Sequence, residues 1–196
     1  MVPAPAPESP LLLGPRVLLR RWRTSDRAAM AAINADAQVM QHFPAPLPRA
    51  ESDALVDRIE AHFAQHGFGP WALEIPGVIE FAGLVGLMHV AFSAPFTPAV
   101  EIGWRLTPAC WGQGYASEAA RCALRYGFET LGLEQIVSFT VPENHRSLAV
   151  MQRLGMHCDL REDFLHPRLP AGHRLRLHRL YRIARQQWLA QHSPAR

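Results

Sequence analysis

The 196-residue chain contains no lysine, and all 20 of its basic side chains are arginine. Mechanisms that need a lysine nucleophile or a lysine Schiff base are therefore excluded, and so is the Walker-type phosphate loop, whose lysine reaches the β- and γ-phosphates. Arginine cannot replace lysine in these roles, because its guanidinium group stays protonated. Since only two asparagines stand beside 17 prolines, we interpret the bias as compositional rather than functional.

Cysteines and long apolar runs are also scarce. Cys110, Cys122 and Cys158 are odd in number and lack CxxC spacing, which predicts reduced core thiols rather than a disulfide framework or a zinc ribbon. The N-terminal segment lacks a positively charged region, and the apolar run that follows it covers only residues 11–13. Neither a signal peptide nor a membrane span is predicted. We expect a cytoplasmic protein with a disordered, proline-rich leader over residues 1–10.

The charge balance predicts neither a nucleic-acid partner nor a membrane partner. The formal net charge is only +3, and the arginines are scattered along the chain rather than gathered into one run. Hydrophobic residues make up 48% and charged residues 19%, which is ordinary for a globular protein. At about 100–200 residues per domain, the length predicts one domain, over residues 11–192. The sequence leaves open whether two chains form a homodimer.

Strand-like runs alternate with helical periodicity, which predicts a domain of mixed α and β structure. Thr24 or Ser25 is expected to cap the first helix, Gly67 to close the second, and Pro76-Gly77 to turn between two strands. The predicted strands cover residues 16–22, 71–75, 81–90, 100–106, 135–141, 156–161 and 175–183, and the predicted helices end near residues 35, 66, 131, 154 and 192.

The segment Trp111-Gly112-Gln113-Gly114-Tyr115-Ala116 lies between a predicted strand and a predicted helix. Glycine lets backbone N–H groups approach a ligand closely, and the helix N-terminus adds free donors and partial positive charge, so the segment suits an anion. On its own the pattern also fits a tight turn. A dinucleotide-binding fingerprint would need a third glycine where Ser117 stands and an acidic residue after the next strand, and neither is present.

This segment resembles the pyrophosphate loop of the GNAT acetyltransferases, whose pattern is Gln/Arg-x-x-Gly-x-Gly/Ala. Gly114 and Ala116 match the pattern, and Trp111 stands where Gln or Arg is expected. A tryptophan there is usual in the ribosomal-protein-alanine (RimJ/RimL-like) branch. The likeness to that branch extends, in order, over about residues 11–183, through the segments 18–22, 100–106, 111–119, 140–144, 147, 150–151, 154–156, 163–164 and 166–167.

The resemblance implies an α+β fold: a single GNAT-like domain with a mixed, mostly antiparallel central sheet flanked by helices. The fourth and fifth strands would splay apart, and acetyl-CoA, the implied cosubstrate, would enter that wedge. Its pantetheine arm would pair with the backbone of Trp104, Arg105 and Leu106. Its pyrophosphate would lie on Gly112, Gln113, Gly114, Tyr115, Ala116 and Ser117. No metal cofactor is implied.

The implied reaction is the attack of an amine on a thioester, which requires a base for the amine and protonation or stabilisation of the departing thiolate. Glu101, on the strand beside the wedge, is the candidate base, acting directly or through water; a carboxylate paired with an arginine is the alternative. His89, on the preceding strand, is the second candidate and could equally be a packed core residue.

Asn144 and Ser147 open the helix after the fifth strand. Asn144 has an ordinary explanation as a helix N-cap, and the resemblance gives it a second role, a hydrogen bond to pantetheine. The resemblance places Ser147 near the thioester sulfur, both as a cofactor contact and as general acid, a role that a water molecule could also fill.

Two further groups of residues have simpler explanations. His62 and His66 share one helix face, but no glutamate lies between them where a metalloprotease needs it and no third ligand follows, so a solvated face and no metal are expected. Arg121, Arg125 and Arg146 could pair with the 3′-phosphate of CoA or be ordinary exposed charges.

The predicted function is an N-acetyltransferase that uses acetyl-CoA on a primary amine. Family likeness favours a protein N-terminal α-amine, whose pKa of about 7.7–8.0 asks less of a base than a lysine amine at about 10.4. A small-molecule amine stays open as the acceptor. The alternative from another class is a non-catalytic module that binds or senses acyl-CoA.

Overall fold

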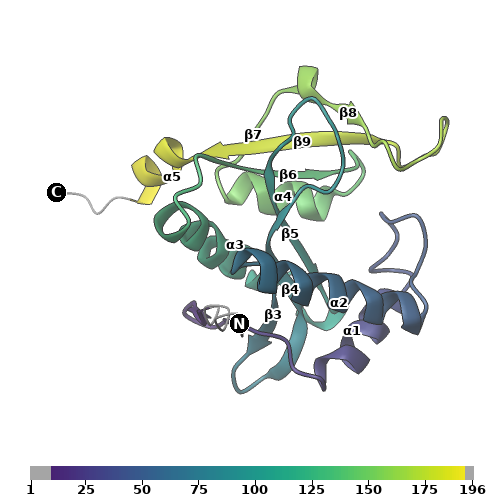
Figure 1. The fold of residues 1–196 in the computed structure, drawn as a ribbon, viewed down its shortest axis with the longest axis vertical. Helices are drawn as coiled ribbons and strands as arrows, with labels where there is room; N and C mark the ends of the chain where they lie inside the picture. The colour runs from purple at the N-terminus through teal and green to yellow at the C-terminus, as the bar shows by residue number, and fades with distance from the viewer. Residues whose placement is uncertain (1–9, 193–196) are drawn as a thin grey trace, which may run out of the picture.

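The computed structural model describes residues 10–192, so the predicted leader lies outside the described residues except for Pro10. One nine-stranded sheet, ordered β1-β2-β3-β4-β5-β6-β9-β7 with β8 paired to β9, runs through the molecule (Figure 1). The strands are β1 (Leu12–Leu13), β2 (Leu18–Arg20), β3 (Pro70–Ile75), β4 (Ile79–His89), β5 (Val100–Leu106), β6 (Gln135–Thr140), β7 (His157–Cys158), β8 (Phe164–Leu165) and β9 (Leu177–Ala184). The α-helices are α1 (Asp26–Ala35), α2 (Arg49–His66), α3 (Tyr115–Arg125), α4 (His145–Arg153) and α5 (Arg185–His192).

The predicted fold class is confirmed: the structure is a single α+β domain whose strands pair antiparallel except between β5 and β6. β5 and β6 are the predicted fourth and fifth strands. They share a single register pair, Glu101 with Val137, whereas β4 and β5 pair over seven positions. The two strands therefore separate beyond Glu101, and the predicted wedge lies between two halves of the sheet.

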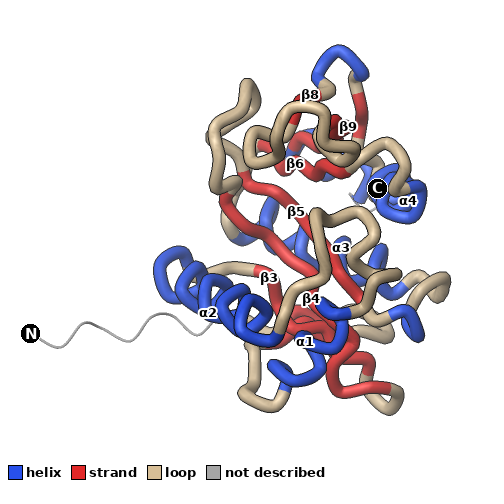
Figure 2. Tube along the Cα trace, turned by 90° about the vertical axis from the view of Figure 1, so that its right-hand side faces the viewer, coloured by secondary structure: helices blue, strands red, loops and turns tan. Residues whose placement is uncertain are grey.

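Helices cover the two halves of the sheet differently. Figures 1 and 2 show α1 and α2 against the half that holds β3 and β4, and α4 beside the half that holds β6 and β9. One buried cluster joins α2 and α3 to the sheet and includes Phe63, Trp71, Phe128 and Trp188. A second lies under α1 and includes Met30 and Phe81. The first cluster also includes residues of β6, β9 and α4, so one continuous core connects the two halves of the sheet.

The predicted end of α2 and the predicted turn between β3 and β4 are confirmed. In α2, apolar residues recur every four positions at Leu55, Ile59 and Phe63, and the last two are each 1% exposed. Gly67 closes this helix with φ 77°, a left-handed conformation that suits glycine. Gly77, at φ 75°, sits in the predicted turn, where the N–H of Val78 donates to the carbonyl of Ile75 at 2.9 Å.

The predicted N-cap of α1 is correct in position, but the predicted hydroxyl hydrogen bond is absent. Ser25 holds the N-cap position, but its hydroxyl makes no capping hydrogen bond. Asp26 acts instead: its Oδ2 accepts the N–H of Arg23 at 2.7 Å, and its carboxylate pairs with Arg20 at 2.7 and 2.9 Å. Asp26 and Arg20 are each 3% exposed, so tertiary packing selected the buried pair over a local hydroxyl cap.

Three other predicted boundaries differ from the structure. The helix expected to reach residue 131 changes at Tyr126 into a π-helical turn, where Gly127 packs so closely that an added Cβ would lie 2.8 Å from Ile136. The strand expected over residues 156–161 is β7 followed by a short 3₁₀ helix. The terminal helical turn is the full helix α5, anchored by Trp188 at 2% exposure.

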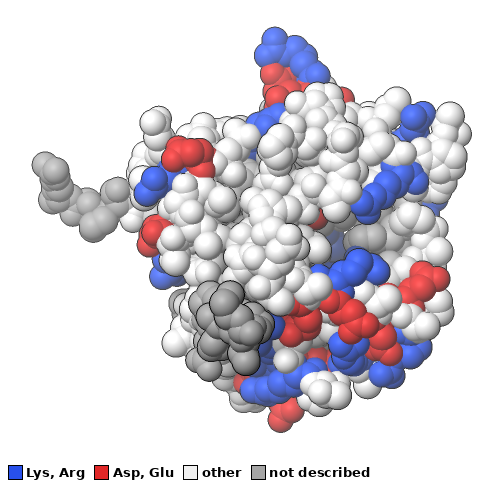
Figure 3. Space-filling view, viewed as in Figure 1, with Lys and Arg blue, Asp and Glu red and all other residues white. Residues whose placement is uncertain are grey.

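The expectations on cysteines and charge are consistent with the structure. Cys110 and Cys122 are free and buried, and Cys158 is free and partly buried. On the face shown in Figure 3, arginine and acidic side chains are interspersed and form no single basic surface. No helix among the described residues is long and apolar enough to cross a bilayer.

Candidate active site

A cavity of about 1300 Å³ opens where β5 and β6 separate. Except for His89, the second candidate base, every residue predicted as catalytic or cofactor-binding lines it: Glu101, Trp104, Arg105, Leu106, Gly112, Gln113, Gly114, Tyr115, Ala116, Ser117, Asn144 and Ser147. These residues come from β5, the loop before α3 and the start of α4. The fold therefore gathers into one space a set of residues that the sequence places on three separate elements.

The main chain of β5 presents an unfilled strand edge to this cavity. The carbonyl of Ile102 accepts the Ser138 hydroxyl of β6 at 2.9 Å, so the polar groups of residue 102 face β6. Because these groups alternate in direction along a strand, those of Trp104 and Leu106 face the same open side, while those of Arg105 face β4. The Leu106 carbonyl already accepts the indole N–H of Trp111 at 2.9 Å. Trp104 is thus the residue whose main-chain groups stay available to an extended ligand.

The loop before α3 has the backbone geometry that an anion site requires. Gly112 and Gly114 have φ 75° and 85°, a conformation that L side chains rarely adopt. The first helical hydrogen bond runs from the N–H of Glu118 to the carbonyl of Gly114 at 3.0 Å. The N–H groups of residues 115–117 precede that bond and remain free donors at the positive end of the helix.

Arg16 is a component of this loop that the sequence did not reveal. Glu118 would place a negative charge in the first turn of α3, beside the anion site. Arg16 neutralises it through an ion pair of 2.8 Å, and a further guanidinium N–H donates to the carbonyl of Gln113 at 3.2 Å. Since residues 16 and 118 are 102 positions apart, no local pattern could have joined them.

Arginines line the cavity beside the loop. Arg121, Arg125 and Arg146 all contribute to its wall. Arg146 lies over the Trp111 ring, with its Cζ 4.3 Å from the ring centroid. Among the described residues none of the three forms an ion pair with a carboxylate, so they supply uncompensated positive charge. This placement favours the phosphate-binding interpretation over that of ordinary surface charge.

Glu101 lies on the same strand face as Met88, its register partner on β4, and both line the cavity. Burial raises the pKa of the Glu101 carboxyl to about 7, and the nearby positive charge of Arg168 opposes that rise. The carboxyl therefore exchanges its proton near neutral pH, as a general base requires. Arg168 itself donates to the carbonyl of Ala91 rather than pairing with Glu101, so the alternative of a fixed ion pair is not observed.

Trp104, Ser147 and Asn144 form a hydrogen-bonded chain on the cavity wall. The indole N–H of Trp104 donates to the Ser147 hydroxyl at 3.3 Å, which leaves the hydroxyl proton of Ser147 free to donate elsewhere. Asn144 is the N-cap of α4: its Oδ1 accepts the N–H of Ser147 at 3.3 Å, and its Nδ2 donates to Thr140 at 2.9 Å. The capping role of Asn144 is observed, and one N–H of its amide remains available.

A second wall of the cavity, opposite the phosphate loop, comes from the segment after α1. His42 and Phe43 line it, together with the side chain of Arg105. Arg105 donates to Asn34 Oδ1 at 2.5 Å and stacks on Phe43, with Cζ 4.1 Å from the ring centroid. Burial lowers the pKa of Arg105 to about 10 and also lowers that of His42. None of these contacts of Arg105 involves a carboxylate.

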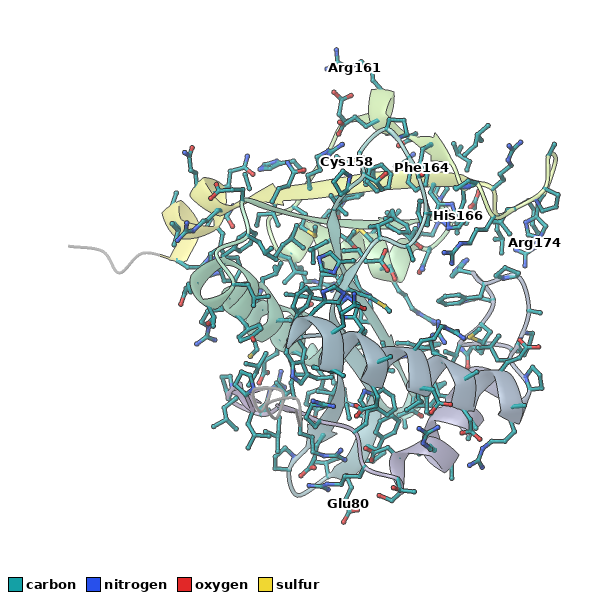
Figure 4. The ribbon with its side chains drawn as sticks, viewed as in Figure 1. Glu80, Cys158, Arg161, Phe164, His166 and Arg174 are labelled. Atoms are coloured by element: carbon teal, nitrogen blue, oxygen red, sulfur yellow. The ribbon has the colours of Figure 1, made fainter. Side chains whose placement is uncertain are left out.

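The rim of this second wall is closed by a loop from the other half of the sheet. Figure 4 shows Arg174 on the loop before β9, beside the segment between α1 and α2. Its guanidinium donates to the carbonyl of Gln41 at 3.2 Å. Phe164 and His166, also labelled there, belong to an aromatic cluster that continues through Phe139 into the cavity wall. The wedge is therefore bridged across its mouth.

Gly103 leaves a gap in the cavity wall between Glu101 and Arg105. Side chains at alternate positions of a strand share a face, so position 103 points the same way as its two neighbours in that series. A Cβ added to Gly103 would meet no atom within 4 Å. The glycine therefore keeps the space beside the Glu101 carboxyl open.

The structure removes His89 from the candidate bases. Strand alternation directs its side chain to the opposite face from Met88 and Glu101, and it does not line the cavity. His89 Nδ1 lies 3.1 Å from Nε2 of His62 instead. The expectation of a solvated face is wrong for His62, which is 8% exposed and bonds the carbonyl of Phe68 at 2.7 Å.

Comparisons with known proteins agree with this geometry. The family model of the acetyltransferase (GNAT) domain matches residues 16–157. The uncharacterized N-acetyltransferase YnaD of Bacillus subtilis is 31% identical over 175 residues, which cover 88% of this chain and 96% of the relative. The FsC-acetyl coenzyme A-N(2)-transacetylase of Aspergillus fumigatus is 36% identical over 66% of this chain and 55% of its own length. The crystal structure of a GNAT-family acetyltransferase from Bacillus anthracis superposes with a TM-score of 0.73 at 25% identity, covering 90% of this chain and 99% of that one.

Proposed function

The chain belongs to the GNAT family of acetyltransferases, and we propose that it transfers the acetyl group of acetyl-CoA directly to a primary amine within a ternary complex. The observation that carries the proposal is the buried carboxyl of Glu101, with a pKa of about 7, beside the open space at Gly103. Acetyl-CoA fits the other features of the cavity. The free N–H groups of residues 115–117 suit its pyrophosphate, and the open edge at Trp104 suits the amides of its pantetheine arm.

In the proposed step, Glu101 accepts the proton of the amine, directly or through water, as the nitrogen attacks the thioester carbon. The C–N bond forms, the C–S bond breaks, and the thiolate of CoA takes a proton. Ser147 passes that proton to the thiolate and takes one back from solvent water, since its hydroxyl accepts a hydrogen bond from Trp104 and keeps its own proton to donate. Asn144 holds the start of α4 so that Ser147 faces the cavity.

The acceptor that we propose is a peptide α-amine, in line with the RimJ/RimL-like likeness of the sequence. An α-amine of pKa about 7.7–8.0 can lose its proton to a carboxylate with a pKa near 7 at little cost. On the acceptor side Arg105 carries a positive charge without a carboxylate partner among the described residues, which disfavours polycationic amines. The name of the Aspergillus relative, an N(2)-transacetylase, supports acetyl-CoA as the donor and nitrogen as the acceptor atom.

Thiol release from acetyl-CoA tests the proposal over a panel of N-terminal alanine peptides, small neutral amines and spermidine. We expect turnover with the peptides, weaker turnover with the neutral amines and none with spermidine. Binding of acetyl-CoA without turnover on any acceptor would support a non-catalytic acyl-CoA-binding module instead.

The variant Gly103→Leu tests whether the reaction takes place in this cavity. A Cβ at position 103 meets no atom within 4 Å, and the leucine side chain would extend from there into the cavity and fill the gap beside Glu101. We therefore expect the variant to fold like the parent. Loss of at least about 100-fold in kcat/KM with an unchanged melting temperature would place the reaction in this cavity. Full activity of the variant would contradict it.

A further inference from the structure

Three histidines gather on the face of the sheet opposite the cavity. His62 and His66 lie one turn apart near the end of α2, and His89 is the last residue of β4. One ring nitrogen from each lies within 4.8 Å of the corresponding nitrogens of the other two. The proposed acetyl transfer uses none of them, because they do not line the cavity.

The hydrogen bonds fix the protonation of His62 in a way that suits a metal ligand. A carbonyl oxygen can only accept, so the Nδ1 atom that lies 2.7 Å from the Phe68 carbonyl carries the ring proton. Nε2 then holds the lone pair, which accepts the backbone N–H of His89 at 3.2 Å, and a bound metal ion would take the place of that hydrogen bond. Metal-binding histidines commonly donate the second ring N–H to a backbone carbonyl in this manner, which fixes the ring orientation.

The spacing is close to that of a coordination shell. Two nitrogens bound to one tetrahedral zinc ion at about 2.0–2.1 Å are about 3.4 Å apart. His62 Nε2 and His89 Nδ1 are 3.1 Å apart, and the ring centroids of His66 and His89 are 4.5 Å apart. His66 is partly exposed in the last turn of α2, and a change of its side-chain rotamer would have to bring its ring nitrogen the remaining distance.

The surroundings favour an ion that prefers nitrogen ligands. Phe68 packs against the rings of His62 and His89, at centroid distances of 5.0 and 5.3 Å, and no carboxylate belongs to the cluster. Ions that require oxygen ligands, such as magnesium and calcium, are therefore disfavoured relative to zinc, nickel or copper.

We propose that His62, His66 and His89 bind one divalent transition-metal ion, with zinc(II) as the reference ion. His89 is exposed, so solvent reaches the ion and a water molecule completes its coordination. The ion joins the end of α2 to the end of β4. Met88, the residue before His89, lines the active-site cavity. The bound ion therefore also restricts the motion of the strand that forms one cavity wall.

The experiment uses the full chain without a histidine tag, freed of metal by chelation and dialysis. Zinc(II) binding is followed by calorimetry, and cobalt(II) binding by the visible absorption of the ion, whose intensity reports tetrahedral nitrogen coordination. We expect one ion per monomeric chain and a rise in melting temperature with zinc(II). An absence of binding, or half an ion per chain with zinc-dependent dimerisation, would overturn the proposal.

Variants assign the ligands. His66→Gln and His89→Gln are each expected to weaken zinc(II) binding by at least about tenfold. His157→Gln, which alters an exposed histidine on β7, is the matched control and should bind like the parent. Melting in the presence of chelator separates loss of a ligand from loss of the fold, because these substitutions at exposed or partly exposed sites should leave it unchanged. A His66→Gln/His89→Gln double variant that still binds one ion with the parent affinity would refute the site.

Discussion

Glu101 shows how burial changes the chemistry of one residue. In water a glutamate carboxyl is ionised well below neutral pH and is a weak base toward an ammonium group. Inside the wedge, desolvation raises its pKa from an ordinary value of 4.5 to about 7. That value approaches the pKa of a peptide α-amine, so proton transfer between the two groups is nearly balanced.

Glu101→Gln tests this balance through the pH profile. For the parent we expect kcat/KM to rise with pH up to about 7, as the carboxyl becomes a carboxylate. The variant should lose about 10²–10⁴-fold in kcat/KM at neutral pH and lose that limb of the profile. Ser147→Ala is the comparison: it should lower kcat and leave the limb in place, since Ser147 does not titrate in this range. Full turnover in both variants would remove the proposed roles.

The difference in melting temperature between the Glu101→Gln variant and the parent should depend on pH in a defined direction. The carboxyl binds its proton more tightly in the folded state than in the unfolded state, so its contribution to stability falls as pH rises from 4.5 to about 7. Above that range the parent bears the full cost of a buried charge. The glutamine variant should therefore melt higher than the parent above pH 7 and equally at pH 4.5 or below.

The start of α1 shows how an element is fixed by a distant partner. The Asp26 carboxylate accepts hydrogen bonds from the guanidinium of Arg20 on β2 and from the backbone N–H of Arg23, while the Ser25 hydroxyl makes no capping hydrogen bond. Glu74 of β3 adds a further contact to Arg20 at 2.7 Å. The helix is thus tied to two strands through one buried guanidinium.

Asp26→Ala leaves that guanidinium without its main partner. We expect a loss of about 3–5 kcal/mol in the free energy of unfolding, measured by urea denaturation. Ser25→Ala, at an exposed position with no capping bond, should cost less than about 0.5 kcal/mol. If both variants lost the same free energy of unfolding, the local cap at Ser25 would contribute as much to stability as the buried ion pair, which would contradict this prediction.

The whole molecule consists of two packed halves that meet at β5 and β6. The Arg174–Gln41 bond joins them across the mouth of the wedge, and the aromatic cluster at Phe139 packs beside it. A ligand that fills the cavity touches both halves and should stabilise the domain as a unit.

Coenzyme A should therefore raise the melting temperature. At about 100 times its dissociation constant it adds about 2.7 kcal/mol, which for a chain of this size is about 5–10 °C. Dephospho-CoA, which lacks the 3′-phosphate, should give a smaller shift if Arg121, Arg125 and Arg146 bind that group. No shift with saturating CoA would mean that the folded chain does not bind the family's cosubstrate, and would contradict the proposal.

The sequence by itself determined the features that depend on neighbours along the chain. The glycines of the loop at 112–114, the helix behind them and the apolar spacing of α2 all follow from local backbone and side-chain preferences. Together with the ordered motifs, they were enough to predict the fold class and twelve of the residues that line the cavity.

Only the tertiary structure decided which distant side chains meet and how far they are buried. Arg16 joins Glu118 across 102 positions, His62 joins His89 across 27, and Trp104 joins Ser147 across 43. The raised pKa of Glu101 depends on desolvation by the assembled wedge. Burial and contacts between remote segments arise when the sheet and helices pack, and a linear pattern encodes neither; for that reason His89 and Ser25 differ from their predicted roles.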